Sequence, residues 1–418
     1  MSSIYFLRFI MTKNRHKIAS YSLLLILSIL NLSTSKATIT RDSHGTVLIE
    51  HNSGRKVTTI RTLYGNFPIK HNSKDAVILD IINHPMFQRL KTVHQYGVTH
   101  FVRTKAIYIR PHNDYTRFEH SVGAMVISRK FNRPLEEQIA TLLHDIKHTA
   151  FSHVGDLLFQ KEGANLPYHD RDLKNFMLKH DFDEIFTQYK IKIDDILPET
   201  IGKISLKKPT NMLCTDRIEY TLQGAFKLGL LQQEEIIDIL SSLKFNNEQQ
   251  LWYFTSPLTA SKFGYISLKI TKKNSGAAWN PIIYKLMARI LTQALEKENP
   301  VFEKHRIKHS LSDNEIWSML TNCKDEFIEK SMHWLEQHEN LYTIARPDAS
   351  PSHVISKVNI PVFRAIDPDI LDGNEIKPLS SIDDEFGTYF NDLKRLMVYD
   401  GWSIEFTIPV SVQQFYGC

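Results

Sequence analysis

The sequence predicts a mainly α fold with a smaller α+β part near its C-terminal end. In residues 75–243 apolar side chains recur at spacings of three and four, as in Ile78, Ile81 and Ile82, which is typical of amphipathic helices. After residue 344 the pattern becomes mixed, with two runs that alternate apolar and polar residues as strands do. The chain has 418 residues, of which 42% are apolar, so it can form one large domain or two smaller ones with a buried core.

The first 37 residues have the features of a targeting segment. A basic stretch, 13–17, precedes an apolar run, 21–32, and Ser35-Lys36-Ala37 offers a small-x-small cleavage site. The apolar run has 12 residues, whereas a membrane-spanning helix needs about 20. We therefore expect a signal peptide and export to the periplasm or the exterior. An uncleaved anchor or a buried N-terminal helix, in a membrane-tethered or cytoplasmic protein, stays open as the alternative.

The net charge of the chain comes from this segment. The whole chain has a formal charge of +5, and residues 1–37 hold five basic residues and no acidic one. The remainder has 46 basic and 46 acidic residues, so its formal charge is zero and gives no electrostatic case for nucleic-acid binding. Cys214, Cys323 and Cys418 are far apart and lack CxxC spacing, so they do not indicate a disulfide framework.

Local patterns organise the rest of the chain. They predict strands at 46–50, 354–363 and 402–412, and helices at 279–298 and 390–397. We divide the chain into a signal peptide, 1–37, a short β-rich segment, 38–74, a helical core, 75–245, a helical extension, 246–345, and an α+β C-terminal region, 346–418. The apolar stripe of helix 279–298 can pack in a core or between copies of the chain, so a homo-oligomer is an open alternative.

Histidines and acids gather in one part of the core. The set comprises His120, His144, Asp145, His148, His153 and Asp156. If residues 136–148 form one helix, His144 and His148 lie on one face, and Asp145 is turned by about 100° from His144. Imidazoles and carboxylates together bind Zn, Fe, Mn and similar divalent ions. A metal ion held by two histidines and two carboxylates keeps coordination positions open for water and substrate, which catalysis requires.

Around these residues the sequence resembles a known family. The matching motifs are Phe87-Gln88-Arg89-Leu90, Gln95, Arg117-Phe118-Glu119-His120-Ser121-Val122-Gly123, Leu143-His144-Asp145-Ile146, His148, Phe151-Ser152-His153 and Asp216-Arg217. In this order they resemble the signature of the HD-domain phosphohydrolases, and more narrowly the branch that contains the deoxynucleoside-triphosphate triphosphohydrolases. The resemblance covers residues 64–226 and continues more weakly through 364–368.

The resemblance implies an HD-domain helical bundle that holds a divalent metal ion, either Mn, Fe, Mg or Zn. The residues that match the protein ligands of the metal are His120, His144, Asp145 and Asp216. Those that match the group contacting phosphate and exchanging protons are His148, His153, Asp156 and His169. Those that match substrate-binding residues are Arg117 near the phosphates, and Gln95 and Tyr220 near the sugar.

Two positions depart from the family pattern. Lys147 stands where the family commonly has glycine, and we expect its side chain to point to solvent rather than to alter the phosphate pocket. Gly224 stands where relatives that select deoxynucleotides often carry an acid near the sugar, which weakens the case for deoxyribose selection. Export would also weaken the case for a nucleoside-triphosphate substrate, because free nucleoside triphosphates are scarce outside the cytoplasm.

Three functions fit these observations. The first is a hydrolase that uses metal-activated water to remove phosphate or triphosphate from a nucleotide, with a (deoxy)nucleoside triphosphate as the expected substrate. The second is a phosphatase acting on a nucleoside monophosphate or another small phosphoester. The third is a nucleotide-binding protein that keeps the fold without turnover, against which the complete ligand set argues. The sequence has no Gly-x-x-x-x-Gly-Lys-Ser/Thr loop, so a P-loop mechanism has no support.

Overall fold

The computed structural model describes most of the chain after the predicted signal peptide. The described residues are 38–41, 47–52, 54, 56–102, 115–161, 166–197, 205–296, 303–344, 355–360 and 362–406. The predicted signal peptide and the last part of the predicted strand 402–412 lie outside them. Within this part of the chain, no helix combines the length and apolar composition needed to cross a bilayer.

Helices dominate the described residues, as the sequence predicts. The helices are α2 Val77–Asn83, α3 Pro85–Gln88, α4 Arg117–Lys130, α5 Leu135–Leu143, α6 Val154–Leu158, α7 Leu173–Lys179, α8 Phe182–Gln188, α9 Thr215–Lys227, α10 Gln233–Ser242, α11 Pro257–Lys273, α12 Trp279–Glu296, α13 Lys304–His309, α14 Asp313–Thr321, α15 Glu326–Glu336 and α16 Asp384–Lys394. The strands are β1 Thr38–Arg41, β2 Leu48–Asn52, β3 Val57–Thr62, β4 Gly65–Lys70, β5 Leu243–Asn246, β6 Leu251–Phe254, β7 Tyr342–Ile344, β8 Ile355–Val358, β9 Asp369–Asp372, β10 Glu375–Pro378 and β11 Trp402–Phe406.

An antiparallel sheet precedes the helical core. Strands β1, β2, β3 and β4 pair in chain order, each with the next. In β3 every second side chain is buried, as expected for a sheet with one face on the core. The predicted strand 46–50 corresponds to β2, which begins at Leu48 and ends at Asn52.

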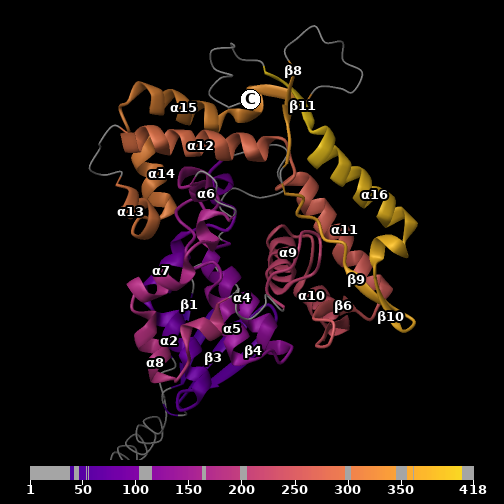
Figure 1. Ribbon diagram of the computed structural model, residues 1–418. Helices are drawn as coiled ribbons and strands as arrows, with labels where there is room; N and C mark the ends of the chain where they lie inside the picture. Colours follow the sequence, from indigo (N-terminus) through magenta and orange to yellow (C-terminus); the bar gives the residue numbers. More distant parts are fainter. Residues whose placement is uncertain are drawn as a thin grey trace, which may run out of the picture.

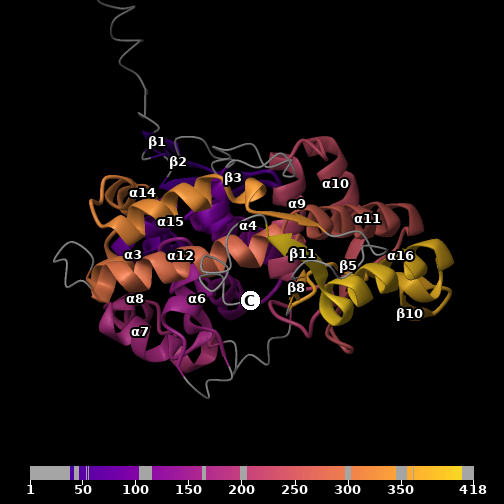
Figure 2. The same ribbon diagram turned by 90° about the horizontal axis from the view of Figure 1, so that it is seen from above.

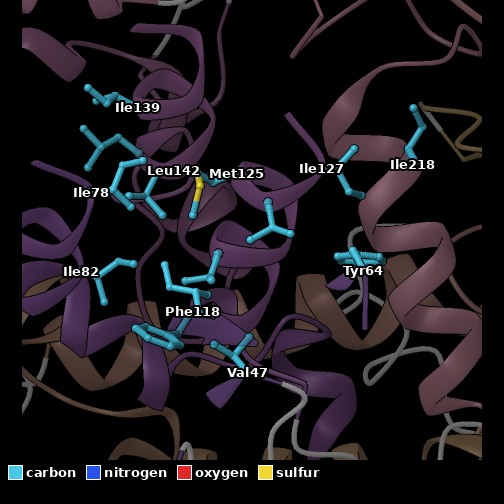
Figure 3. Packing of buried hydrophobic residues seen from close by; sticks show 14 of the residues in the cluster. Val47, Tyr64, Ile78, Ile82, Phe118, Met125, Ile127, Ile139, Leu142 and Ile218 are labelled. Carbon is cyan, nitrogen blue, oxygen red and sulfur yellow. The ribbon is translucent and has the colours of Figure 1, made fainter. Parts of the chain in front are cut away.

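The helical core is built around α4. This helix packs against α5 and α9, and nearly all of its side chains are buried. Figure 3 shows apolar side chains from α2, α4 and α5 converging, with Ile78, Phe118 and Leu142 among them. Because α4 is covered on all sides, the polar residues that it carries are held inside the protein, where they need partners.

The predicted helix over residues 136–148 is wrong at its C-terminal end. Helix α5 ends at Leu143, and the chain then turns. The guanidinium of Arg89 donates to the carbonyl oxygens of Ile146 at 3.0 Å and His148 at 2.7 Å. These carbonyls are thereby paired outside a helix, so the turn is stabilised by a residue that lies far earlier in the chain.

A second layer of helices lies above the core (Figure 1). Helices α12 and α15 run side by side across the top, and α12 also contacts α6 of the core. The predicted helix 279–298 corresponds to α12, and its stripe from Ile282 to Leu291 is buried inside this chain. The stripe therefore serves as core and gives no support to an oligomer interface.

The C-terminal region mixes strands and helix, as predicted. Strand β11 pairs with β7 and β8, and β9 pairs with β10 and, in parallel, with β6 of the hairpin β5–β6. Figure 2, seen from above, shows α16 beside α11 at one side of the molecule. The helix predicted at 390–397 begins earlier, at Asp384, where the Asp383 carboxylate caps it, and a π-helical turn, Arg395–Asp400, follows.

Candidate metal and phosphate site

Helix α4 positions the first histidine of the site. Thr116 caps the helix by accepting from the backbone N–H of Glu119 at 3.2 Å, and the Glu119 carboxylate accepts from the N–H of Thr116 at 3.0 Å. This capping box starts the helix immediately before its buried polar face. As a result His120 lies fully buried, one turn into the helix.

Four side chains from three places in the chain meet at one point. The Nε2 atom of His120 lies 3.1 Å from Nε2 of His144, 3.1 Å from Oδ1 of Asp216 and 3.4 Å from Oδ2 of Asp145. His144 Nε2 is 3.7 Å from Asp216 Oδ1 and 3.5 Å from Asp145 Oδ1. Donor atoms bound about 2.1 Å from a common divalent ion are separated by about 3 to 3.5 Å, so this set has the spacing of metal ligands.

Hydrogen bonds on the far side of the two rings test whether they fit a metal. His144 Nδ1 lies 2.6 Å from the carbonyl oxygen of Thr141, which only accepts, so Nδ1 carries the proton. His120 Nδ1 contacts the carboxylate of Glu219. The two Nε2 atoms therefore face each other, and a cation between them would take the place of the proton on His120 Nε2 and bind both nitrogen lone pairs. Burial lowers the pKa of His120, but Glu219 and Asp216 outweigh it and raise the pKa to about 10, so the surroundings favour positive charge at this point.

Glu219 is a site residue that the sequence reasoning missed. It is fully buried, holds His120 Nδ1, and accepts from the hydroxyls of Tyr115 at 2.6 Å and Tyr64 at 2.9 Å. The available signal was its position three residues after Asp216 on the predicted helix, which places both carboxylates on one face. A carboxylate behind a ligating histidine fixes the ring orientation and makes the ligand more basic.

Asp145 connects the metal ligands with the second predicted group. Its Oδ2 accepts from Arg117 Nη1 at 2.5 Å, and its Oδ1 lies 3.4 Å from Nε2 of His148. Burial would raise the pKa of Asp145, but His144 and Arg117 outweigh it and hold the pKa well below its usual value. The carboxylate is therefore charged when the protein is folded.

The second group forms a cluster of three histidines around one acid. Asp156 accepts from Nδ1 of His153 at 2.9 Å and from Nδ1 of His169 at 2.9 Å, and the ring of His148 stacks on that of His169 with centroids 4.0 Å apart. Burial raises the pKa of Asp156, but the hydrogen bonds from His153 and His169 outweigh it and hold the pKa well below its usual value. Asp156 thus fixes both rings by their Nδ1 atoms and leaves their Nε2 atoms for other contacts.

Both groups face one cavity of about 240 Å³. Of the residues predicted from the sequence, the cavity is lined by Gln95, Arg117, His144, Asp145, His148, His153, His169, Asp216 and Tyr220. His120 and Asp156 lie behind this lining. The sequence reasoning missed the cavity residues Asp170, Lys207, Lys208, Arg217 and Arg364. Of these, Arg217 and Arg364 lie in segments that match the family, but the sequence analysis assigned no role to either arginine.

The two departures from the family pattern have structural explanations. We expected Lys147 to point to solvent, and this prediction is wrong. The side chain is buried, does not line the cavity, and donates from Nζ to the carbonyl oxygen of Arg171. Burial lowers its pKa to about 8. At Gly224, an added Cβ atom would lie 2.8 Å from the hydroxyl oxygen of Tyr96, so the tyrosine occupies space that a larger side chain would need.

Comparisons with known proteins agree with this site. No family model matches the chain. It is 26% identical over 316 residues to the metal-dependent phosphohydrolase cns2 of Cordyceps militaris, across 73% of this chain and 83% of the relative. It is 26% identical over 175 residues to the deoxynucleoside triphosphate triphosphohydrolase SAMHD1 of Gallus gallus, across 36% of this chain and 27% of that protein.

A solved structure extends the similarity to the fold. The phosphohydrolase structure from Bacteroides thetaiotaomicron superimposes with a TM-score of 0.56, at 18% identity, over 83% of this chain and 98% of that one. By sequence and by the arrangement of its site, the chain is similar to the HD-domain phosphohydrolases. Within this superfamily it resembles the deoxynucleoside-triphosphate triphosphohydrolase branch. The protein is a phosphohydrolase with a divalent metal cofactor.

Proposed function

We propose that this phosphohydrolase removes phosphate or triphosphate from a nucleotide, with a (deoxy)nucleoside triphosphate as its substrate. One observation carries the proposal: a metal-ligand set and a histidine cluster face the same cavity, whose lining also holds the cations Arg117, Lys207, Lys208 and Arg364. Such a lining suits a substrate with several negative charges. The partial similarity to a triphosphohydrolase supports the same substrate class.

Each group in the cavity has a distinct task in this proposal. A bound divalent ion would supply activated water and offset the charge on phosphoryl oxygens. His120, His144, Asp145 and Asp216 would hold it. The Nε2 atoms of His153 and His169, whose Nδ1 atoms are fixed by Asp156, would hold a phosphate oxygen when they carry a proton, and that proton would pass to the leaving group. Gln95 and Tyr220 line the same cavity and would contact the sugar.

A phosphatase acting on a nucleoside monophosphate is the second candidate. The observation that favours it is at Gly224, where relatives that select deoxynucleotides often carry an acid and where this chain has the Tyr96 hydroxyl nearby. Without that acid, recognition of deoxyribose has less support than hydrolysis of a phosphoester.

Product analysis distinguishes these candidates. Purified protein is incubated with Mn²⁺, Mg²⁺, Fe²⁺ or Zn²⁺ and a panel of nucleoside and deoxynucleoside triphosphates and monophosphates, and released phosphate and triphosphate are measured, with Asp145→Ala as the control. Triphosphate release is the expected result. Release of phosphate from monophosphates alone would select the phosphatase, and metal binding without release from any nucleotide would overturn the proposal.

A further inference from the structure

Arg364 brings a cation into the cavity from the C-terminal region. It follows β8 in the chain, lines the cavity, and places Nη2 3.5 Å from Nε2 of His153. The two residues are separated by 211 positions in the sequence. The side chain is half-buried, so its guanidinium lies at the edge of the histidine cluster and is partly shielded from bulk water.

The other cations of the cavity are largely occupied. Arg117 is paired with Asp145, and Lys207 with Asp170. Arg217 donates to the carbonyl oxygens of Lys208, Pro209 and Met212. Among the described residues, no carboxylate pairs with Arg364, and its approach to His153 is at the limit of a hydrogen bond. Arg364 therefore has its donors available for an anion.

The backbone on both sides of Arg364 is held in place by Asn211. The side-chain amide of Asn211 donates to the carbonyl oxygens of Phe363 at 3.0 Å and Ala365 at 2.7 Å, and its own backbone carbonyl accepts from the N–H of Asp367 at 3.0 Å. Phe363 and Ala365 are buried, so the clamp is shielded from water. Three hydrogen bonds to one residue thus fix the strip of chain that presents Arg364.

The loop that contains Asn211 also connects this clamp to a metal ligand. Asn211 lies in the loop whose carbonyls bind Arg217, and Arg217 follows Asp216 directly on α9. Asn211 has φ of 75°, a left-handed conformation that asparagine adopts more readily than most residues. The loop therefore links the start of α9, which carries a metal ligand, to the residue that orients Arg364.

We propose that Arg364 is a phosphate-binding residue of this site and that Asn211 is its positioning residue. The inference rests on the proposed function, because it assigns the residue of the C-terminal region that would bind a phosphate of the substrate. A planar guanidinium presents parallel N–H donors to phosphate oxygens. Because it lies beside His153 Nε2, the guanidinium would contact the same phosphate as His153.

Binding of inorganic phosphate tests the role of Arg364 without turnover. The full chain is loaded with Mn²⁺ and titrated with phosphate by calorimetry, using wild type, Arg364→Gln and the matched control Arg395→Gln, an exposed arginine of the same region. Arg364→Gln should bind phosphate at least tenfold more weakly, with Mn²⁺ affinity within threefold of wild type. Arg395→Gln should match wild type in both measurements. Equal phosphate affinity in Arg364→Gln, or no phosphate binding by wild type, would overturn the assignment.

A double variant tests whether Asn211 acts through Arg364. Asn211→Gly removes the amide while glycine keeps the left-handed conformation without strain. It should weaken phosphate binding several-fold in the wild-type chain and have no further effect in Arg364→Gln. Additive losses would show that Asn211 does not act through Arg364 and would overturn its positioning role. If Arg364-dependent phosphate binding is found but no nucleotide is hydrolysed, the proposed function fails while this inference stands.

Discussion

At the scale of single residues, the chemistry depends on which nitrogen atom each histidine presents. Thr141 and Glu219 bind the Nδ1 atoms of His144 and His120, and Asp156 binds those of His153 and His169. In each case an acceptor behind the ring leaves Nε2 to face the other site residues. The acceptors therefore organise the site although they do not line the cavity.

Glu219→Gln should weaken Mn²⁺ binding by about 10- to 100-fold, because the amide supports His120 less strongly than a carboxylate does. Calorimetric titration of Mn²⁺ measures the effect. Glu235→Gln, which removes an exposed carboxylate paired with Lys262, is the matched control and should leave the affinity unchanged. Wild-type affinity in Glu219→Gln would show that the carboxylate is not needed behind the ring.

His144→Ala and His153→Ala should separate the two groups. His144→Ala should abolish both metal binding and turnover, because an open site cannot lose a direct ligand. His153→Ala should retain the metal while lowering the rate by about 100-fold or more. Metal content and phosphoester hydrolysis are measured in parallel, with the exposed His305→Ala as control. Loss of metal in His153→Ala would mean that the two groups have been assigned the wrong way round.

At the scale of elements, the site depends on how closely α4 approaches α9. A Cβ atom on Gly123 would lie 2.4 Å from Oε1 of Glu219 and 3.0 Å from Cε2 of Tyr64. Neither neighbour can retreat easily, because the Tyr64 hydroxyl and the Glu219 carboxylate are hydrogen-bonded to each other in the core. The absence of a side chain at Gly123 thus allows His120 on α4 to meet Asp216 on α9.

Gly123→Ala should therefore destabilise the protein, although alanine in a helix is normally favoured over glycine by about 1 kcal/mol. We expect a loss of about 1 to 3 kcal/mol from overpacking, together with weaker Mn²⁺ binding, measured by urea unfolding and calorimetry. Lys130→Ala, at the exposed end of the same helix, is the control for alanine itself. A stabilised Gly123→Ala protein would show that α4 and α9 can separate without cost.

At the scale of the whole molecule, the upper helical layer supports the site from a distance. Asp313 of α14 accepts from the backbone N–H groups of His94 at 2.9 Å and Phe151 at 2.7 Å. Ser152 adopts a positive φ of 54°, donates to the carbonyl of His94 and accepts from Arg117. The turn that precedes His153 is thus held between the two layers, so the site depends on the packing of the whole chain.

The same region makes stability depend on pH. Burial and the neighbouring His100 lower the pKa of His94 to about 3, whereas an unfolded histidine has a pKa of about 6.5. The folded state therefore keeps His94 neutral while the unfolded state takes up a proton, and stability is lost as pH falls below 6.5. Between pH 7.5 and 5.5 this amounts to about 1.4 kcal/mol.

His94→Gln removes this titration. In urea unfolding with EDTA present, the variant should lose about 1.4 kcal/mol less than wild type between pH 7.5 and 5.5. Groups that do not contact His94 contribute equally to both proteins, so the difference reports this ring and its coupling to His100. Identical pH dependence of the two proteins would mean that His94 is not held neutral in the folded state.

The amino-acid sequence was sufficient to predict the helical class of the core and nine of the residues that line the cavity. Helices such as α12 follow from local apolar spacing, which is a property of neighbouring residues. The histidines and aspartates were assigned from motifs that resemble the family signature, and their side chains are of the types that bind divalent ions. The order of the motifs also predicts that residues such as His120 and Asp216 share one site, although they lie far apart in the chain.

The features that depend on contacts between distant segments became visible only in the folded chain. Helix α5 ends at Leu143 because Arg89 binds the following carbonyls, and Lys147 turns inward to the carbonyl of Arg171. Arg364 reaches His153 across 211 positions of the chain. Local periodicity contains no information on such pairs, because each is formed by the packing of segments whose separate patterns do not refer to each other.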